Sequence, residues 1–176
     1  MLKRKSGFTI VELLIVIVVI GILAAITIVA YNGIQDRSRA SYLVSDLKKI
    51  EKAFRLFGTD QGISTWWLDN ALTGTANPNI NTVISSTNLK DYLQTLNPIP
   101  GYPTSYYMYD SDGDSINTST CTASTGGTSI YVTGASQTLA QLTDSMIDDG
   151  DITCGKLRWY APGNQIMYVM ASSPAF

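Results

Sequence analysis

The clearest pattern in the chain is a long uncharged segment near its N-terminus. From Leu13 to Ala30 no charged residue occurs, and only Gly21 and Thr27 interrupt the aliphatic run. At ~1.5 Å per helical residue, the segment 8–30 would span about 34 Å, whereas the hydrocarbon core of a bilayer is about 30 Å thick. The pattern therefore predicts a helix that is long enough to cross a membrane.

One residue does not fit a simple membrane anchor. Glu12 places a carboxylate one turn inside the apolar segment, and a charge near the bilayer centre costs about 2.5–3.5 kcal/mol on insertion scales. A secretory signal is also a poor match, because its apolar core is shorter and contains no acid. The cluster Lys3-Arg4-Lys5 before the segment should stay in the cytoplasm and leave the C-terminal part outside.

After Ala30 the pattern becomes amphipathic without a helix breaker. Large apolar residues recur at spacings of four and three, which makes one stripe along a helix. These residues are Leu43, Leu47, Ile50, Phe54 and Phe57. Charged residues fill the other faces, namely Asp46, Lys48, Lys49, Glu51, Lys52 and Arg55. We predict one continuous helix from about Phe8 to Phe57, ended by Gly58, whose second half packs its stripe on a sheet.

The remainder, 59–176, reads as a globular headpiece of mixed α and β structure. Residues 59–104 are rich in Asn, Thr, Ser and Gly and contain Trp66-Trp67, which favours a long surface loop. Within that loop we predict one short helix, Leu89–Leu96, capped by Thr87 or Asn88. The three prolines between Asn97 and Pro103 would close the loop.

Four strands are predicted after the prolines, with a short helix following Ser136. The last two strands should form a hairpin through Pro162-Gly163-Asn164. The predicted strands are 105–109, 129–133, 157–161 and 165–171. The expected fold is α+β, a long N-terminal helix packed on a small antiparallel sheet.

The segment Gly7-Phe8-Thr9-x-x-Glu12-Leu13, behind a basic leader and before a long apolar helix, resembles the type IV pilins and pseudopilins. The resemblance covers roughly the first 55 residues, and the headpiece matches only in general layout. It implies that a prepilin peptidase removes the leader 1–7 by cutting between Gly7 and Phe8. The same enzyme would then N-methylate Phe8. Segment 8–30 would be the membrane and filament-core helix, and segment 31–58 its amphipathic half.

The resemblance also implies a role for Glu12 in assembly. Cleavage would create a cationic amine at Phe8, four residues before Glu12, and residues at that spacing share one helical face. The amine could therefore be neutralised by the same subunit's Glu12 or by that of a neighbour, and in a low dielectric a lateral partner would be strongly favoured. The alternative is a plain anchor whose terminal Glu reaches back to the interface.

The two cysteines, Cys121 and Cys154, are most simply one disulfide in an external domain. Such a bridge would close the region 121–154 and stabilise it by roughly 3–4 kcal/mol in the loop-entropy model. The pattern also resembles the cysteine-closed C-terminal loop of many pilins. Two free thiols are the alternative.

One stretch hints at a metal site. Asp110, Asp112 and Asp114 alternate around Gly113, and such a turn can converge oxygens on Ca²⁺ as the first half of an EF-hand loop does. Cys121 stands where an EF-hand would need a bidentate acid, so a plain acidic hairpin turn is preferred. Asp148-Asp149-Gly150-Asp151 reads as a turn that closes the short helix. No cofactor is therefore expected, and calcium bound at Asp110, Asp112 and Asp114 is the alternative.

Charge and composition point to a structural protein rather than an enzyme. The chain has no histidine, which removes the commonest general base, and it contains neither a Walker loop nor a dinucleotide fingerprint. The headpiece is acidic, so binding to DNA or to a host surface is not indicated. The expected partners are copies of the chain itself, other pilins, the prepilin peptidase, the pilus assembly platform and, before assembly, the membrane.

Three functions are compatible with these observations. The favoured one is a pilin of an extracellular filament, because the surface loop is long and polar and a disulfide suits external exposure. The alternatives are a pseudopilin of a type II secretion or competence system, and a membrane-tethered surface domain.

Overall fold

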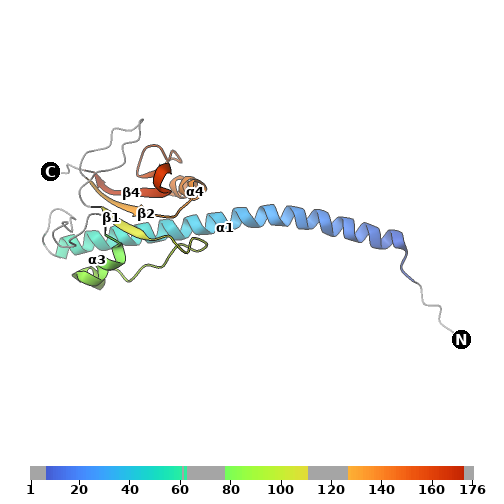
Figure 1. The fold of residues 1–176 in the computed structure, drawn as a ribbon, viewed down its shortest axis with the longest axis horizontal. Helices are drawn as coiled ribbons and strands as arrows, with labels where there is room; N and C mark the ends of the chain where they lie inside the picture. Colours follow the sequence, from blue (N-terminus) through green and yellow to red (C-terminus); the bar gives the residue numbers. More distant parts are fainter. Residues whose placement is uncertain (1–6, 61, 63–77, 111–126, 173–176) are drawn as a thin grey trace. The chain divides into compact units, whose positions relative to one another are not determined.

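A computed structural model of the 176-residue chain describes residues 7–60, 62, 78–110 and 127–172 (Figure 1). Its elements, in chain order, are α1 (Ile10–Asp60), α3 (Ile80–Ser86), the 3-10 helix η1 (Asn88–Asp91), β1 (Tyr107–Asp110), β2 (Gly127–Val132), α4 (Gln137–Ile147), β3 (Leu157–Tyr160), the 3-10 helix η2 (Ala161–Gly163) and β4 (Gln165–Ser172). The expected α+β class, with one long N-terminal helix and a small antiparallel sheet, is confirmed.

The long helix α1 is continuous, as predicted, but both ends differ from the prediction. It begins at Ile10 rather than Phe8, and it passes through Gly58 to end at Asp60. The expectation that Gly58 ends the helix was wrong. Gly58 is buried beside the core residue Phe57, and this packing holds the chain in the helix for two more residues. The chain turns instead at Gly62, whose φ of 65° is the left-handed conformation that glycine adopts easily.

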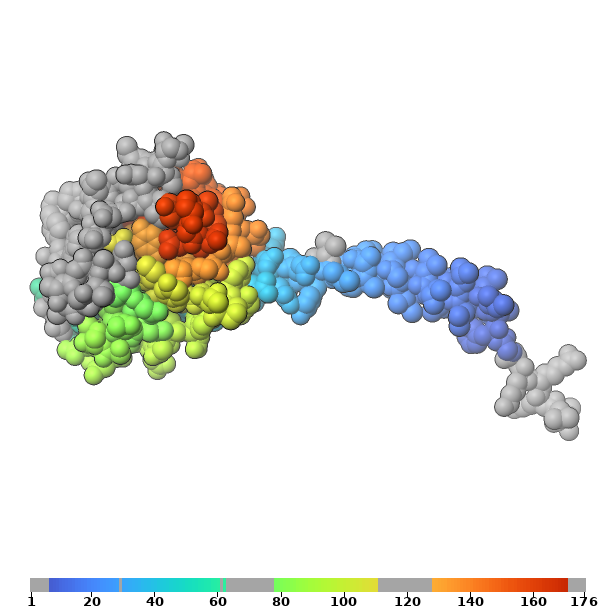
Figure 2. All heavy atoms as spheres, viewed as in Figure 1, coloured from blue at the N-terminus to red at the C-terminus, as the bar shows by residue number. Residues whose placement is uncertain are grey.

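The chain divides into two compact units, Met1–Arg37 and Ser38–Phe176. In the first unit the apolar side chains between Ile10 and Ile28 are all exposed (Figure 2). In the second unit the predicted stripe of α1 is buried, which confirms the expectation that it forms part of the core. Leu43, Leu47, Ile50 and Phe54 are fully buried, and Phe57 is nearly so.

The sheet has the strand order β1-β2-β4-β3, and each neighbouring pair is antiparallel. The predicted hairpin is confirmed: η2 and Asn164, at a φ of 47°, connect β3 to β4. The other strands lie within two residues of the predicted ranges. Ser136 caps α4 by accepting a hydrogen bond from the Leu139 N–H at 3.2 Å, so the short helix after Ser136 is confirmed as well.

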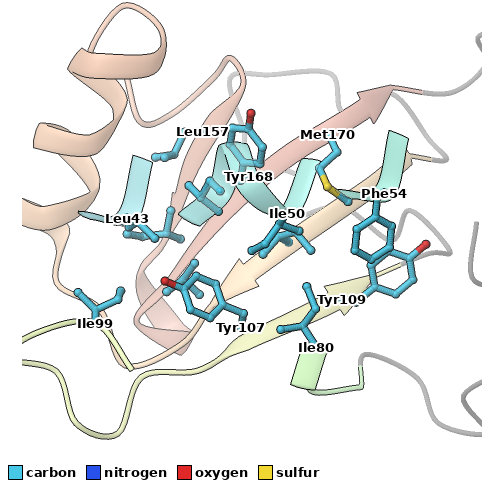
Figure 3. Packing of buried hydrophobic residues seen from close by; sticks show 14 of the residues in the cluster. Leu43, Ile50, Phe54, Ile80, Ile99, Tyr107, Tyr109, Leu157, Tyr168 and Met170 are labelled. Atoms are coloured by element: carbon cyan, nitrogen blue, oxygen red, sulfur yellow. The ribbon is translucent and has the colours of Figure 1, made fainter. Parts of the chain in front are cut away.

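One face of the sheet packs on the buried stripe of α1 (Figure 3). Phe54 of α1 stacks on Tyr109 of β1, with ring centroids 4.9 Å apart and planes inclined by 22°. Ile80 of α3 and Tyr168 of β4 are buried in the same cluster. Side chains of α1, α3 and the sheet thus form a single core within the second unit.

The loop prediction for residues 59–104 needs correction. A helix that was not predicted, α3, inserts Ile80, Val83 and Ile84 into the core. The predicted helix 89–96 was too long: the structure has only the short η1, which ends at Asp91. Its expected cap, Thr87, does accept a hydrogen bond from the Leu89 N–H. Trp66 and Trp67 lie outside the described residues.

Candidate processing and assembly site

The start of α1 is held by a reciprocal pair of side chains. The Glu12 carboxylate accepts hydrogen bonds from the Thr9 backbone N–H at 2.8 Å and from the Thr9 hydroxyl at 2.7 Å. In return, the Glu12 N–H donates to the Thr9 hydroxyl oxygen at 3.3 Å. Thr9 and Glu12 therefore form a capping box, which satisfies N–H groups that have no partner inside the helix.

The expected cleavage residues lie just before this cap. Gly7 and Phe8 are outside the helix, and the Phe8 side chain is 83% exposed. Because α1 begins at Ile10, Phe8 and Glu12 do not share a helical face in this chain, contrary to the expectation from their spacing. The leader residues 1–6 lie outside the described part of the chain. The peptide bond expected to be cut is therefore in a non-helical, exposed segment next to a defined helix start.

The hydrogen bonds to the Glu12 carboxylate come from Thr9, and none of the described residues gives it a cationic partner. Thr9 supplies both of its described hydrogen bonds, and among residues 7–60, 62, 78–110 and 127–172 no Lys or Arg forms an ion pair with it. Directly after it, α1 contains a stretch whose length and hydropathy suffice to cross a membrane, and none of that stretch is buried within the chain. Within the described residues, the site thus combines an acid that has no cationic partner with an apolar helix that no other part of the chain covers.

The second half of α1 carries two acids that the sequence pattern placed at the surface. Asp46 is only 2% exposed and accepts a hydrogen bond from the Tyr107 hydroxyl at 3.0 Å. Glu51 accepts a hydrogen bond from the Tyr168 hydroxyl and pairs with Arg55 at 2.8 Å and with Lys156 at 3.1 Å. Both acids therefore attach α1 to the sheet.

The environment of Glu51 favours its charged form. Burial acts to raise the pKa of this carboxyl, but the hydrogen bonds from Tyr168, Arg55 and Lys156 outweigh burial and lower it. Burial and the bond to Glu51 raise the pKa of the Tyr168 hydroxyl, so it stays a donor. The contact between α1 and β4 is consequently a charge-assisted hydrogen bond.

The predicted disulfide and calcium site are not tested by the structure. Cys121, Asp112 and Asp114 fall outside the described residues. Asp110 is the last residue of β1 and is buried. Within the described residues, no group of three or more His, Cys, Asp or Glu is placed to hold a metal ion.

Two functional features escaped the sequence interpretation. The capping box could have been found, since Thr9-x-x-Glu12 has its spacing, but the interpretation paired Glu12 with Phe8 alone. The buried Asp46 had no such local signal, because its partner Tyr107 lies 61 residues away in the chain.

The N-terminal region matches known proteins. Residues 2–28 match the family model described as the prokaryotic N-terminal methylation motif. Over 77 residues the chain is 42% identical to "Fimbrial protein EcpC" of Eikenella corrodens, which covers 43% of this chain and 49% of that protein. It is 34% identical over 58 residues to "Type II secretion system core protein G" of Aeromonas hydrophila, covering 33% and 41%.

A third relative is "Type IV major pilin protein PilA" of Myxococcus xanthus, 41% identical over 58 residues, or 33% of this chain and 26% of that protein. In each case the match spans less than half of the relative's length, and no solved structure matches. These relatives are structural pilins and pseudopilins and not enzymes. The chain therefore carries the prokaryotic N-terminal methylation motif, and its N-terminal region is similar to those of type IV pilins and type II secretion pseudopilins.

Proposed function

We propose that this protein is a pilin, the repeated structural subunit of a type IV pilus-like extracellular filament. The observation that carries the proposal is the uncovered apolar half of α1, whose side chains between Ile10 and Ile28 are all exposed. Exposed apolar area costs free energy in water, so a membrane or other copies of the helix must cover it. When a subunit moves from the bilayer into a filament core, its apolar side chains exchange contacts with lipid for contacts with the helices of other subunits.

Glu12 determines how neighbouring helices align in this proposal. Prepilin peptidase cuts between Gly7 and Phe8 and methylates the new amine of Phe8. That amine lies before the start of α1, while Thr9 holds the Glu12 carboxylate at the start of the helix. The Phe8 amine of a neighbouring subunit neutralises Glu12 in the low dielectric of the filament core, which sets the axial register between subunits.

Before assembly the subunit spans the cytoplasmic membrane once, with its headpiece outside. The cluster Lys3-Arg4-Lys5 orients it and remains on the cytoplasmic side with the peptidase. The assembly platform then extracts the subunit into the filament.

The bridge between Cys121 and Cys154 stabilises the external headpiece, and a mass increase of two hydrogens on reduction tests it. Ca²⁺ binding by Asp110, Asp112 and Asp114 is the lesser proposal, and calorimetric titration of the purified chain tests it.

The test separates the charge of Glu12 from its capping role. Glu12→Leu removes both, whereas Glu12→Gln keeps a capping side chain and removes only the charge. We expect both variants to accumulate as processed, membrane-inserted monomers with strongly reduced filament yield. Thr9→Ser, which retains the cap, is the matched control and should assemble normally. Normal filaments from Glu12→Gln would mean that Glu12 acts only as a cap, and pairing with the amine would then be wrong.

A second candidate function is that of a pseudopilin. It is favoured by the similarity to the core protein G of Aeromonas hydrophila, which is a type II secretion protein by name. Electron microscopy of cells with and without the protein distinguishes the two. Long surface filaments at native expression support the pilin, filaments seen only on overexpression support the pseudopilin, and no filaments under either condition support a membrane-tethered surface domain.

A further inference from the structure

A groove of about 550 Å³ lies in the second unit, between the amphipathic half of α1 and the segment that follows η1. Its wall on α1 includes Tyr42, Lys49, Lys52 and Leu56, and its opposite wall is formed by residues 92–97. The groove is open to solvent and its lining mixes apolar, aromatic and cationic groups. It is therefore shaped for a short polar segment of protein rather than for a wholly apolar ligand.

Two lysines and one acid, Asp46, line the groove. Asp60 accepts a hydrogen bond from the lining residue Tyr92, so the positive charge lies on the α1 side, at Lys49 and Lys52. Lys49 is 60% exposed and is partly neutralised by Asp46 at 3.1 Å, but Asp46 also accepts from Tyr107. Lys52 is exposed, and no ion pair of this side chain occurs within the described residues. After α1, the chain from residue 61 to its end has far more acids than cations. A partner segment that carries carboxylates could form an ion pair with Lys52 and so neutralise its positive charge.

The chain itself presents an acidic segment of this kind. Asp148, Asp149 and Asp151 form the exposed turn between α4 and β3. Local hydrogen bonds fix the turn: the Lys156 N–H donates to Asp148 at 2.8 Å, the Asp151 N–H to Asp149 at 2.9 Å, and the Thr153 N–H to Asp151 at 2.9 Å. In the described part of the chain no cation pairs with these three carboxylates.

The fixed geometry of the turn 148–151 lowers the entropic cost of binding it to a partner. Asp149 and Asp151 use Oδ1 in their described turn bonds, which leaves Oδ2 of each available to a lysine. The hydrogen bonds from Thr153 also lower the pKa of Asp151, so its charge persists at mildly acidic pH. A rigid turn with outward carboxylates loses little freedom when it docks.

We infer that the groove of one subunit binds the acidic turn 148–151 of a second copy of this chain. Within the second unit, α3 and α4 lie on different sides of α1 (Figure 1); the groove opens beside the segment after η1, and the turn follows α4. Two different surfaces of the same subunit therefore meet, and such a heterologous contact generates rings or open helical polymers. The inference rests on the proposed filament function, because it assigns a headpiece contact within that filament.

A charge swap tests the contact in the full chain, expressed in cells that lack the native copy. Lys52→Glu and Asp149→Lys each juxtapose like charges, and we expect each to reduce the yield of sheared filaments roughly tenfold, given the size of such penalties at interfaces. The double variant restores opposite charges and should recover most of the yield. Lys48→Glu is the matched control, because Lys48 is exposed on the same helix but does not line the groove; its yield should stay normal.

Cross-linking gives a second readout that does not depend on yield. In filaments of Lys52→Cys combined with Asp149→Cys, a short bis-maleimide should produce a ladder of covalent oligomers, and neither single variant should do so. Normal filaments without a ladder, or a charge swap that fails to recover, would overturn the contact while leaving the filament function intact. Absence of filaments from the unaltered chain would overturn both the filament function and the contact.

Discussion

The Tyr107 hydroxyl donates a buried hydrogen bond to Oδ2 of Asp46 at 3.0 Å and thereby joins β1 to the second half of α1. Lys49 contacts the other carboxylate oxygen at 3.1 Å, so the buried acid is satisfied on both sides. Burial, followed by the charge of Asp46, raises the pKa of Tyr107, and the hydroxyl therefore remains a donor across the neutral range. A polar contact of this kind fixes the rotation of α1 relative to the sheet more sharply than apolar packing alone.

Replacing Tyr107 by Phe should destabilise the headpiece. The change removes a hydrogen bond to a charged group and leaves a buried carboxylate short of one donor, which costs about 1.5–3 kcal/mol. Urea unfolding of the full chain in detergent, followed by tryptophan fluorescence, measures the loss. Tyr106→Phe is the control, because Tyr106 is 44% exposed and no hydrogen bond of its hydroxyl is described. Equal effects of the two changes would show that the Asp46 contact contributes little.

The parts of the fold that could be predicted are those with local signals. The stripe from Leu43 to Phe57 has the helical period, Pro162-Gly163-Asn164 signals the last hairpin, and Ser136 is a good helix cap. The helix α3 was not predicted, because its three buried residues, Ile80, Val83 and Ile84, lie in a helix of only seven residues within a polar loop. Such a helix owes its stability to the core it enters and not to its own sequence.

In the candidate site, too, features with a local sequence signal could be predicted and features that depend on tertiary contacts could not. Gly7, Phe8 and Glu12 were identifiable because they form one short motif, and the matched region includes them. Gly58 was misread as a helix end because local propensity was weighed without tertiary packing, whereas its neighbour Phe57 is held in the core. The groove beside Lys52 depends on residues 92–97, which lie far from it in the chain, so no sequence pattern could indicate it.

Gly21 offers a test of helix packing in the filament. A glycine inside a helix costs about 1 kcal/mol relative to alanine, and a Cβ atom at this position would meet no atom of the chain within 4 Å. Its advantage must then come from close approach of another helix. We expect Gly21→Ala to leave the membrane-inserted monomer at normal levels and to reduce filament yield, measured by shearing and immunoblotting.

Gly33→Ala is the comparison for this variant, since a Cβ atom there also meets nothing within 4 Å and Gly33 lies beyond the apolar run. It should leave filament yield unchanged. If Gly21→Ala filaments formed as well as the native ones, no neighbouring helix would approach at Gly21.

Asp144 should make the stability of the headpiece depend on pH. This carboxyl of α4 is fully buried, and neither oxygen accepts a hydrogen bond of good geometry from the described residues. Burial raises the pKa of Asp144 to about 6; the Gly150 N–H opposes the rise, and the nearby acids Asp148, Asp149 and Asp151 add to it. The native state therefore binds this proton more tightly than the unfolded chain, whose Asp pKa is about 3.9.

The sign of the effect follows from this difference in proton binding. Below about pH 4, Asp144 is protonated in both the native and the unfolded state, so it does not reduce the free energy of unfolding. Between about pH 4 and 6, the free energy of unfolding falls as pH rises. Above about pH 6, the destabilisation by Asp144 is constant. Asp144→Asn removes the charge and should stabilise the headpiece at pH 7 by about 1–2 kcal/mol, allowing for screening by solvent. The measurement is the difference in unfolding free energy between this variant and the native chain from pH 4 to 8. Taking the difference cancels the contribution of Glu51, whose lowered pKa acts in the opposite direction. A difference that did not vary with pH would mean that Asp144 is already charged and solvated in the native state.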